Sequence, residues 1–210
     1  MLDQQLRPLK DALLDPLAAH LPFSPTQVTL GAFAIGMCAP LLSMLHYPKM
    51  ACICFISNRV LDGVDGLIAR KRNQSSEFGG LLDIVCDFTV YSVLPIGIAF
   101  SQSYSGYGLA FLLASFHLNN TVLFYVAAVM EKLAPRKLRE STSLSMLPAL
   151  IEGTESAVLF ICMLLLPQWI APFCWLMAIC VFIGTLQRLS WAYHSLPGVD
   201  KLRNGSSKTR

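Results

Sequence analysis

Six long apolar runs, separated by short polar links, constrain the fold of this 210-residue chain more than any other feature. Each run has about 18 to 25 residues, which is the length that a helix needs to cross a bilayer. In lipid, a helix can satisfy all its own backbone hydrogen bonds. The runs cover residues 28–45, 50–68, 80–100, 109–130, 146–166 and 169–193. We therefore expect an all-α, polytopic membrane protein with six transmembrane helices.

The overall composition supports this class and excludes others. Hydrophobic residues make up 54% of the chain, charged residues 14%, and the mean hydropathy is +0.55. These values are too apolar for an ordinary soluble domain. The formal net charge is only +3 and forms no basic patch of the kind that binds nucleic acid. The length suits a single domain.

The two ends of the chain differ from the apolar region between them. Residues 2–21 place leucines near helical period with charged residues between them. This pattern predicts an N-terminal amphipathic helix that lies in the membrane interface or, alternatively, packs on the protein's own cytosolic face. No apolar run directly follows the first basic residues, so we expect no cleaved signal peptide. The expected plan is a juxtamembrane segment (1–24), a six-helix domain (25–196) and a basic tail (197–210).

The distribution of lysine and arginine predicts the orientation in the membrane. These residues gather in the N-terminal segment, in the links after the second and fourth runs, and in the tail, whereas the opposite links contain only Lys49. By the positive-inside rule, both termini are cytoplasmic. With no eukaryotic targeting element in the sequence, we expect a bacterial inner membrane.

Four aspartates lie in or beside the second and third runs: Asp62, Asp65, Asp83 and Asp87. Charge at such positions is costly, so it predicts a functional site. If both segments are helical, Asp62 and Asp65 share one face, and Asp83 and Asp87 share a face of the next helix. Two helices would then direct paired carboxylates at one place.

Four carboxylates at close quarters require cations to balance their charge. The possible ligands are all oxygen atoms, and no His or Cys stands at a useful spacing, which favours Mg²⁺ or Mn²⁺ over zinc. Such ions usually act on phosphate-bearing substrates, and Arg70 would bind a phosphate through its fork of donors. Nearby glycines would let a bulky ligand or a second helix approach the backbone. They are Gly63, Gly66, Gly79 and Gly80.

The pattern D-x-x-D-G-x-x-A-R, eight residues, G-x-x-x-D-x-x-x-D resembles the signature of the CDP-alcohol phosphotransferase (CDP-alcohol phosphatidyltransferase) family, class I. Its fixed positions are all filled, by Asp62, Asp65, Gly66, Ala69, Arg70, Gly79, Asp83 and Asp87. The resemblance implies a six-helix, homodimeric membrane enzyme of phospholipid synthesis. It would transfer a phosphatidyl group from CDP-diacylglycerol to a small alcohol and release CMP, with two Mg²⁺ or Mn²⁺ ions as cofactors.

The resemblance also implies roles for the residues of the motif. The expected metal ligands are Asp62, Asp65, Asp83 and Asp87. Asp87 is in addition the expected catalytic base that removes a proton from the acceptor hydroxyl. The positions expected to line the nucleotide and the diphosphate are Gly66, Ala69, Arg70 and Gly79.

The acceptor alcohol stays open at the level of the sequence. A phosphate on the acceptor, as in glycerol 3-phosphate or an inositol phosphate, would suit a basic group formed by Arg136, Lys137, Arg139 and Arg188. The first three also fit ordinary cytoplasmic loop charge. Glu152 and Glu155 would suit the amine of serine or a choline-like acceptor, or would pair with basic residues. We expect His117, Asn119 and Asn120 to form hydrogen bonds between helices.

Other readings of the aspartates remain. In one alternative, the aspartates form an ion-paired polar seam between helices, with Arg59 or Arg70 as counter-ion. Two arginines cannot, however, neutralise four carboxylates. A cation transporter would use them as an ion pathway, and a non-catalytic scaffold would keep only the fold. Within the enzyme class, a different CDP-alcohol with diacylglycerol as acceptor is a further alternative.

Overall fold

The computed structural model describes residues 12–18, 20–133 and 153–195, and these residues contain helices and no β-strand. The expected all-α fold is thus confirmed for this part of the chain. Six helices follow one another, with a short 3₁₀ turn at Pro167–Trp169 before the last. They are α2 (Pro25–Met44), α3 (Pro48–Lys71), α4 (Glu77–Ser101), α5 (Tyr107–Leu133), α6 (Gly153–Leu165) and α7 (Ile170–Ser195).

Four of these helices are long and apolar enough to cross a membrane. The four segments are Pro25–Met44, Glu77–Ser101, Tyr107–Met130 and Pro167–His194. The helix α3 has 24 residues, but its second half carries Arg59, Asp62 and Asp65, which lower its hydropathy. The helix α6 is apolar and shorter in the described residues. The expected multi-pass membrane protein is supported, and the count of six spans stays a prediction.

Local sequence signals set the helix ends. Ser24 caps α2 through a capping box with Gln27, and the Ser76 hydroxyl accepts a hydrogen bond from the backbone N–H of Gly79 at the start of α4. Proline occupies the first turn of both α2 and α3, where its missing N–H is not needed. The links that follow α2, α3 and α4 each contain a non-glycine residue with positive φ, namely His46, Asn73 and Ser103.

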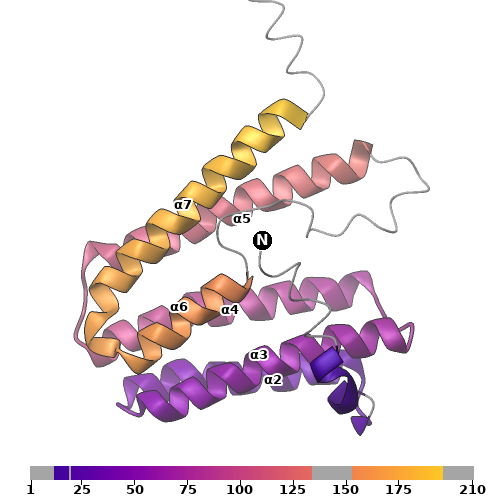
Figure 1. Ribbon diagram of the computed structural model, residues 1–210, viewed down its shortest axis with the longest axis horizontal. Helices are drawn as coiled ribbons and strands as arrows, with labels where there is room; N and C mark the ends of the chain where they lie inside the picture. The colour runs from indigo at the N-terminus through magenta and orange to yellow at the C-terminus, as the bar shows by residue number, and fades with distance from the viewer. Residues whose placement is uncertain (1–11, 19, 134–152, 196–210) are drawn as a thin grey trace, which may run out of the picture.

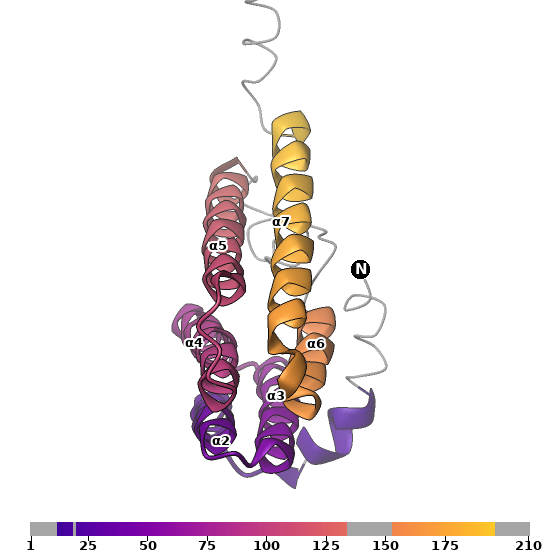
Figure 2. The same cartoon turned by 90° about the vertical axis from the view of Figure 1, so that its left-hand side faces the viewer.

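The helices α2, α3 and α4 run in nearly the same direction, and α5 and α7 are inclined to them (Figure 1). Figure 2 shows α5 and α7 side by side. The helix α2 packs against α3 and α4, α5 packs against α7, and α6 contacts α3. The links after α2, α4 and α6 lie at one end of the molecule, and the link between α3 and α4 lies at the other (Figure 1). That second end carries the aspartate motif. Alternating hairpins of this kind are the topology expected for successive membrane crossings.

Close contact between α2 and α4 depends on small residues. A Cβ atom placed on Gly97 would lie 2.7 Å from the backbone oxygen of Pro40, and one placed on Gly36 would lie 2.7 Å from Nδ2 of Asn58. Only glycine fits at these two positions. The approach of α2 to its neighbours fixes the distance between the elements that carry the motif.

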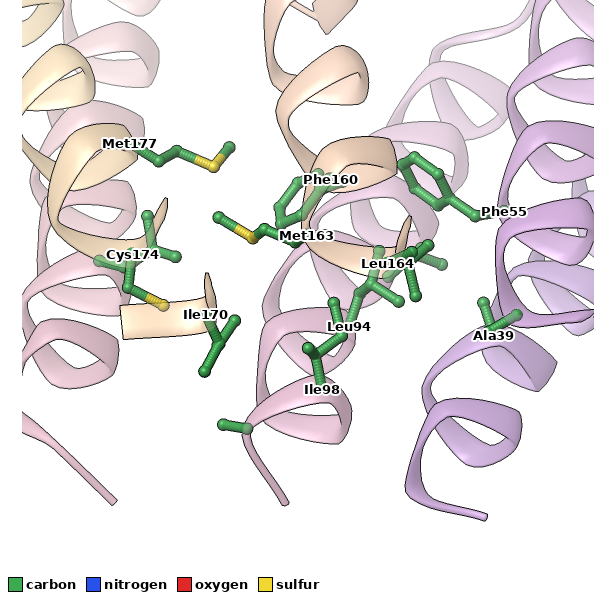
Figure 3. Packing of buried hydrophobic residues seen from close by; sticks show 14 of the residues in the cluster. Ala39, Phe55, Leu94, Ile98, Phe160, Met163, Leu164, Ile170, Cys174 and Met177 are labelled. Atoms are coloured by element: carbon green, nitrogen blue, oxygen red, sulfur yellow. The ribbon is translucent and has the colours of Figure 1, made fainter. Parts of the chain in front are cut away.

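The main hydrophobic core is formed by residues from all of the helices α2 to α7 (Figure 3). Its centre includes Phe55 and Phe160, whose rings meet edge to face with centroids 5.8 Å apart. Leu94, Met163 and Cys174 are fully buried beside them. This core ties α6 and α7 to the helices of the motif, and it lies toward the end opposite the aspartates.

The described part of the N-terminal segment is helical at residues 12–18 and packs on α3. Asp15 forms an ion pair with Lys71, and the side chain of Leu14 lies against Gly63. The segment therefore contacts the protein's own surface near the motif. Residues 2–11 lie outside the described residues, so the amphipathic interfacial helix stays a prediction.

Candidate active site

Three of the four predicted aspartates converge between α3 and α4. One carboxylate oxygen from each of Asp62, Asp83 and Asp87 lies within 4.8 Å of the other two. All three side chains are partly buried. The helical spacing produces this cluster because residues four apart, as in α4, share one face, which here points at Asp62.

The cluster fits a divalent cation. The donors are carboxylate oxygens, which suit hard cations such as Mg²⁺ and Mn²⁺. The Oδ1 atom of Asp83 is buried and has no hydrogen-bond partner within the described part of the chain. A buried carboxylate oxygen is costly to leave unsatisfied, and a bound cation would satisfy it.

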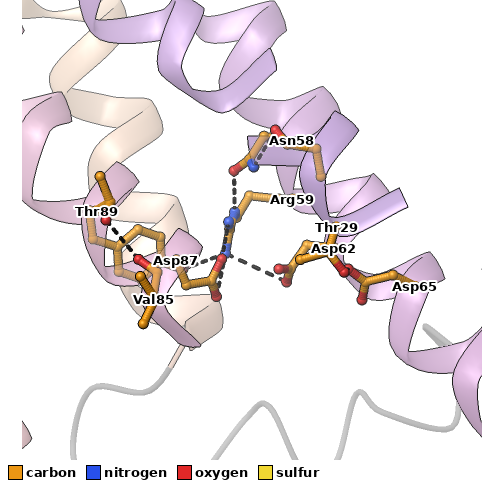
Figure 4. A network of polar contacts seen from close by, with 10 residues as sticks. Thr29, Asn58, Arg59, Asp62, Asp65, Val85, Asp87 and Thr89 are labelled. Carbon is orange, nitrogen blue, oxygen red and sulfur yellow. Dashed lines mark hydrogen bonds and ion pairs between the residues drawn. The ribbon is translucent and has the colours of Figure 1, made fainter. Parts of the chain in front are cut away.

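Asp65 is placed differently from the other three. Asp65 is 4% exposed, and its carboxylate accepts a hydrogen bond of 2.5 Å from the Thr29 hydroxyl of α2. It lies one helical turn from Asp62 on the side away from Asp87 (Figure 4). Its role as a metal ligand stays a prediction. The contact with Thr29 links the motif to α2.

Arg59 is the cation at the centre of the polar network (Figure 4). Its two terminal nitrogens donate to the two oxygens of Asp87, at 2.5 and 3.1 Å. The Nη1 atom also lies 3.1 Å from the hydroxyl of Tyr91 and 3.6 Å from Oδ2 of Asp62. The counter-ion role considered for Arg59 is therefore observed, although one guanidinium cannot neutralise the whole cluster.

The remaining motif positions lie on the two helix ends that flank the link between α3 and α4. Gly66, Ala69 and Arg70 belong to the last turns of α3, and Gly79 to the first turn of α4. The guanidinium of Arg70 lies beside Gly66, 3.3 Å from where a Cβ would stand. Arg70 is exposed. These residues thus lie together at the motif end of the molecule, as the spacing predicts.

A cavity of about 210 Å³ lies beside Asp87, between α4, α5, α6 and α7. Its polar lining includes Asn119, Asn120, Ser156 and Arg188. Arg188 is only 6% exposed, and its Nη1 atom donates to Oδ1 of Asn119 at 2.5 Å. The predicted role of Asn119 in hydrogen bonding between helices is thus confirmed. A pocket that contains both a carboxylate and a guanidinium can orient a small polar molecule against Asp87.

Some sequence predictions are not informed by the structure. Arg136, Lys137, Arg139 and Glu152 lie outside the described residues. Glu155 lies in the first turn of α6 and is partly buried. His117 is exposed on α5, and its backbone oxygen accepts a hydrogen bond from the Thr121 hydroxyl of the same helix.

Three residues of the site were not predicted. Thr29 binds Asp65, Tyr91 binds Arg59, and Asn58 accepts a hydrogen bond from Nε of Arg59 at 2.8 Å. Tyr91 lies one helical turn after Asp87, and this spacing is the sequence signal from which its place at the site could have been predicted. The contact of Thr29 joins residues 36 positions apart and has no local signature.

Two known proteins are similar to this chain in sequence. The inner membrane protein YnjF of Escherichia coli K12 is 31% identical over 206 residues, which cover 96% of this chain and all of that protein. The CDP-diacylglycerol–serine O-phosphatidyltransferase of Helicobacter pylori 26695 is 32% identical over 83 residues, 40% of this chain and 34% of that protein.

A solved structure shares the fold. It is the phosphatidylinositol phosphate synthase of Mycobacterium tuberculosis with CDP-DAG bound, with a TM-score of 0.65 and 19% identity. The match covers 92% of this chain and 95% of that one. The family profile described as CDP-alcohol phosphatidyltransferase matches residues 23–186, which include the aspartate cluster and every residue that lines the pocket except Arg188. The chain therefore belongs to the CDP-alcohol phosphatidyltransferase family.

Proposed function

We propose that this enzyme transfers the phosphatidyl group of CDP-diacylglycerol to a small alcohol and releases CMP, with divalent metal bound at the aspartates. One observation carries the proposal: in a chain of this family, Asp62, Asp83 and Asp87 converge from two helices on one place. Similar proteins support the substrate, because they include CDP-diacylglycerol–serine O-phosphatidyltransferases and a synthase with CDP-DAG bound.

The residues divide the chemistry among them. Two Mg²⁺ or Mn²⁺ ions, held by Asp62, Asp65, Asp83 and Asp87, would neutralise the diphosphate and stabilise the leaving CMP. Asp87 accepts the proton of the acceptor hydroxyl, since it is the cluster member that also lines the pocket. Arg70 binds the diphosphate, and the lack of side chains on Gly66 and Gly79 leaves room for the nucleotide. Ala69 lines the same path.

The pocket beside Asp87 is the proposed acceptor site. Its buried Arg188 favours an acceptor with an anionic group, because a guanidinium pairs with phosphate or carboxylate through two donors. A polyol phosphate such as glycerol 3-phosphate is the favoured acceptor, and serine, which carries a carboxylate, is the alternative. An uncharged polyol or a choline-like acceptor would offer no anionic group to this guanidinium.

The proposal includes a place in the cell. All six helices would cross the membrane, with α3 admitting its charged half because the aspartates face the bound cations rather than lipid. The motif end and both termini would face the cytoplasm of a bacterium, where soluble acceptors are found. A homodimer is proposed on the family resemblance.

The experiment that tests the acceptor and the reaction together is an assay of CMP release. Purified protein in detergent is given labelled CDP-diacylglycerol, Mg²⁺ or Mn²⁺, and one acceptor at a time from glycerol 3-phosphate, inositol phosphate, inositol, serine and choline. We expect an anionic acceptor to stimulate release. Asp87→Asn should abolish it, while Glu77→Gln, which removes an exposed carboxylate in the first turn of α4, should not.

Two results would count against the proposal. Full turnover by Asp87→Asn would remove Asp87 from the reaction. Release that is stimulated equally by choline and by glycerol 3-phosphate would contradict the assignment of Arg188 to an anionic acceptor.

A further inference from the structure

Arg59 occupies the position where a bound cation would meet Asp87. Its guanidinium engages both oxygens of that carboxylate, at 2.5 and 3.1 Å, and lies 3.6 Å from Asp62. A carboxylate that accepts two hydrogen bonds from one guanidinium has its favoured lone pairs occupied. Each oxygen keeps one further lone pair, so a divalent cation at Asp87 must either share the carboxylate with this guanidinium or displace it.

The guanidinium of Arg59 is held in place by three neighbouring side chains, Asn58, Tyr91 and Phe55, which we call the Arg59 cradle. Nε of Arg59 donates to Asn58, and the Tyr91 hydroxyl lies 3.1 Å from Nη1. The Arg59 guanidinium also lies over the rings of Tyr91 and Phe55, 5.0 and 5.8 Å from their centroids. The side chain is 15% exposed.

The cradle is in turn fixed to the neighbouring helix. Nδ2 of Asn58 donates to the backbone oxygen of Ala32 in α2 at 2.9 Å. Gly36 makes room for this amide, since a Cβ there would lie 2.7 Å from the same nitrogen. Arg59 is thus oriented by contacts from α2, α3 and α4. A side chain fixed in this way keeps its charge at the site.

We propose that Arg59 is an internal counter-ion that competes with a divalent cation for Asp87 and so lowers the metal affinity of the site. This inference rests on the proposed metal binding by the aspartates. In the absence of metal, the guanidinium neutralises part of the charge of the cluster and stabilises the packing of α3 on α4. When metal binds, the same positive charge opposes it at close range.

The test measures metal binding without substrate. Free Mn²⁺ is followed by electron paramagnetic resonance as it is titrated into purified wild-type protein, Arg59→Gln and Arg72→Gln in detergent. Arg72 is the matched control because it makes the same change of charge on an exposed side chain that bonds the backbone oxygens of Leu21 and Phe23. We expect Arg59→Gln to bind Mn²⁺ roughly tenfold more tightly than wild type, or more, because a like charge is removed. Arg72→Gln should change the affinity by less than about twofold, since exposed charge is screened.

A milder variant guards against misfolding of Arg59→Gln. Tyr91→Phe removes one partner of Arg59 and keeps the ring, so it should raise Mn²⁺ affinity by a smaller factor. Equal or weaker binding by both variants, when wild type binds Mn²⁺, would overturn the competition and leave the proposed metal site intact. Failure of wild type to bind any Mn²⁺ would overturn the metal site and this inference together.

Discussion

Arg188 is the residue whose substitution tests the choice of acceptor most directly. It is buried in an apolar helix, it donates to Asn119, and it lines the pocket that also contains Asp87. A guanidinium is costly to place in such a segment, which argues for a role in binding. Because Asn119 comes from α5, this contact also fixes how α5 and α7 present the pocket.

Arg188→Gln should raise the KM for the acceptor by roughly ten- to a hundredfold, as expected when a paired charge is lost. The KM for CDP-diacylglycerol should change little, because the diphosphate is assigned to Arg70 and the metals. Arg188→Lys should restore part of the loss, since it keeps the charge without the fork. Steady-state kinetics with each substrate varied in turn checks this. Lys132→Gln, at an exposed position in the last turn of α5, is the charge-matched control. Equal changes in both KM values would contradict the assignment.

At the scale of residues, the sequence predicted that aspartates of two helices converge, but not what surrounds them. Asp83 and Asp87 share a face because they are four apart in a helix, and that much is local. The bonds of Thr29 to Asp65 and of Tyr91 to Arg59 depend on how α2, α3 and α4 cross, which one sequence does not show. The placement of Asp65 apart from the other three has the same cause.

At the scale of helices, the contact of α2 with α4 sets the geometry of the site. Pro40 and Pro95 both lie inside helices, where a proline removes a backbone hydrogen bond. Gly97 lies against Pro40 and lets the two helices meet at this point. The contact between α2 and α4 therefore forms at Pro40, where α2 lacks a backbone hydrogen bond.

Gly97→Val should destabilise the protein, because any side chain there meets the backbone of Pro40. Overpacking costs about 1–3 kcal/mol, which for a chain of this size lowers the unfolding temperature by several degrees, at about 2–4 °C per kcal/mol. Thermal unfolding in detergent, followed by circular dichroism, measures it. Gly31→Val, where a Cβ would meet no atom within 4 Å, is the matched control. An unchanged unfolding temperature for Gly97→Val would contradict the close contact.

The sequence predicted the helices better than their status as membrane spans. The apolar runs placed most of the described helix ends to within about three residues, because hydropathy is a local signal. The caps at Ser24 and Ser76 were not predicted. The helix α3 does not meet a hydropathy criterion for a membrane span, because its second half is charged. Hydropathy alone cannot decide this case, since the cost of burying those charges depends on what the aspartates face. The start of the fifth apolar run lies outside the described residues.

At the scale of the whole molecule, the distribution of charge predicts the orientation in the membrane. If the motif end is cytoplasmic, a reporter fused after Arg210 that fluoresces only in the cytoplasm should be active in bacterial cells. A periplasm-dependent phosphatase fused at the same point should be inactive. The opposite pair of results would reverse the orientation and move the site away from cytosolic acceptors.

The central claim is that divalent metal at the aspartate cluster enables the release of CMP. The most direct test is CMP release by one preparation that is stripped with EDTA and then given Mn²⁺ or Mg²⁺, for wild type and for Asp83→Asn. Asp83 is the choice because its buried Oδ1 has no partner within the described part of the chain. We predict that stripping abolishes release, that metal restores it in wild type, and that it does not do so in Asp83→Asn. CMP release that survives stripping would show that the reaction does not need divalent metal. An Asp83→Asn enzyme restored to the wild-type rate would show that Asp83 does not hold that metal.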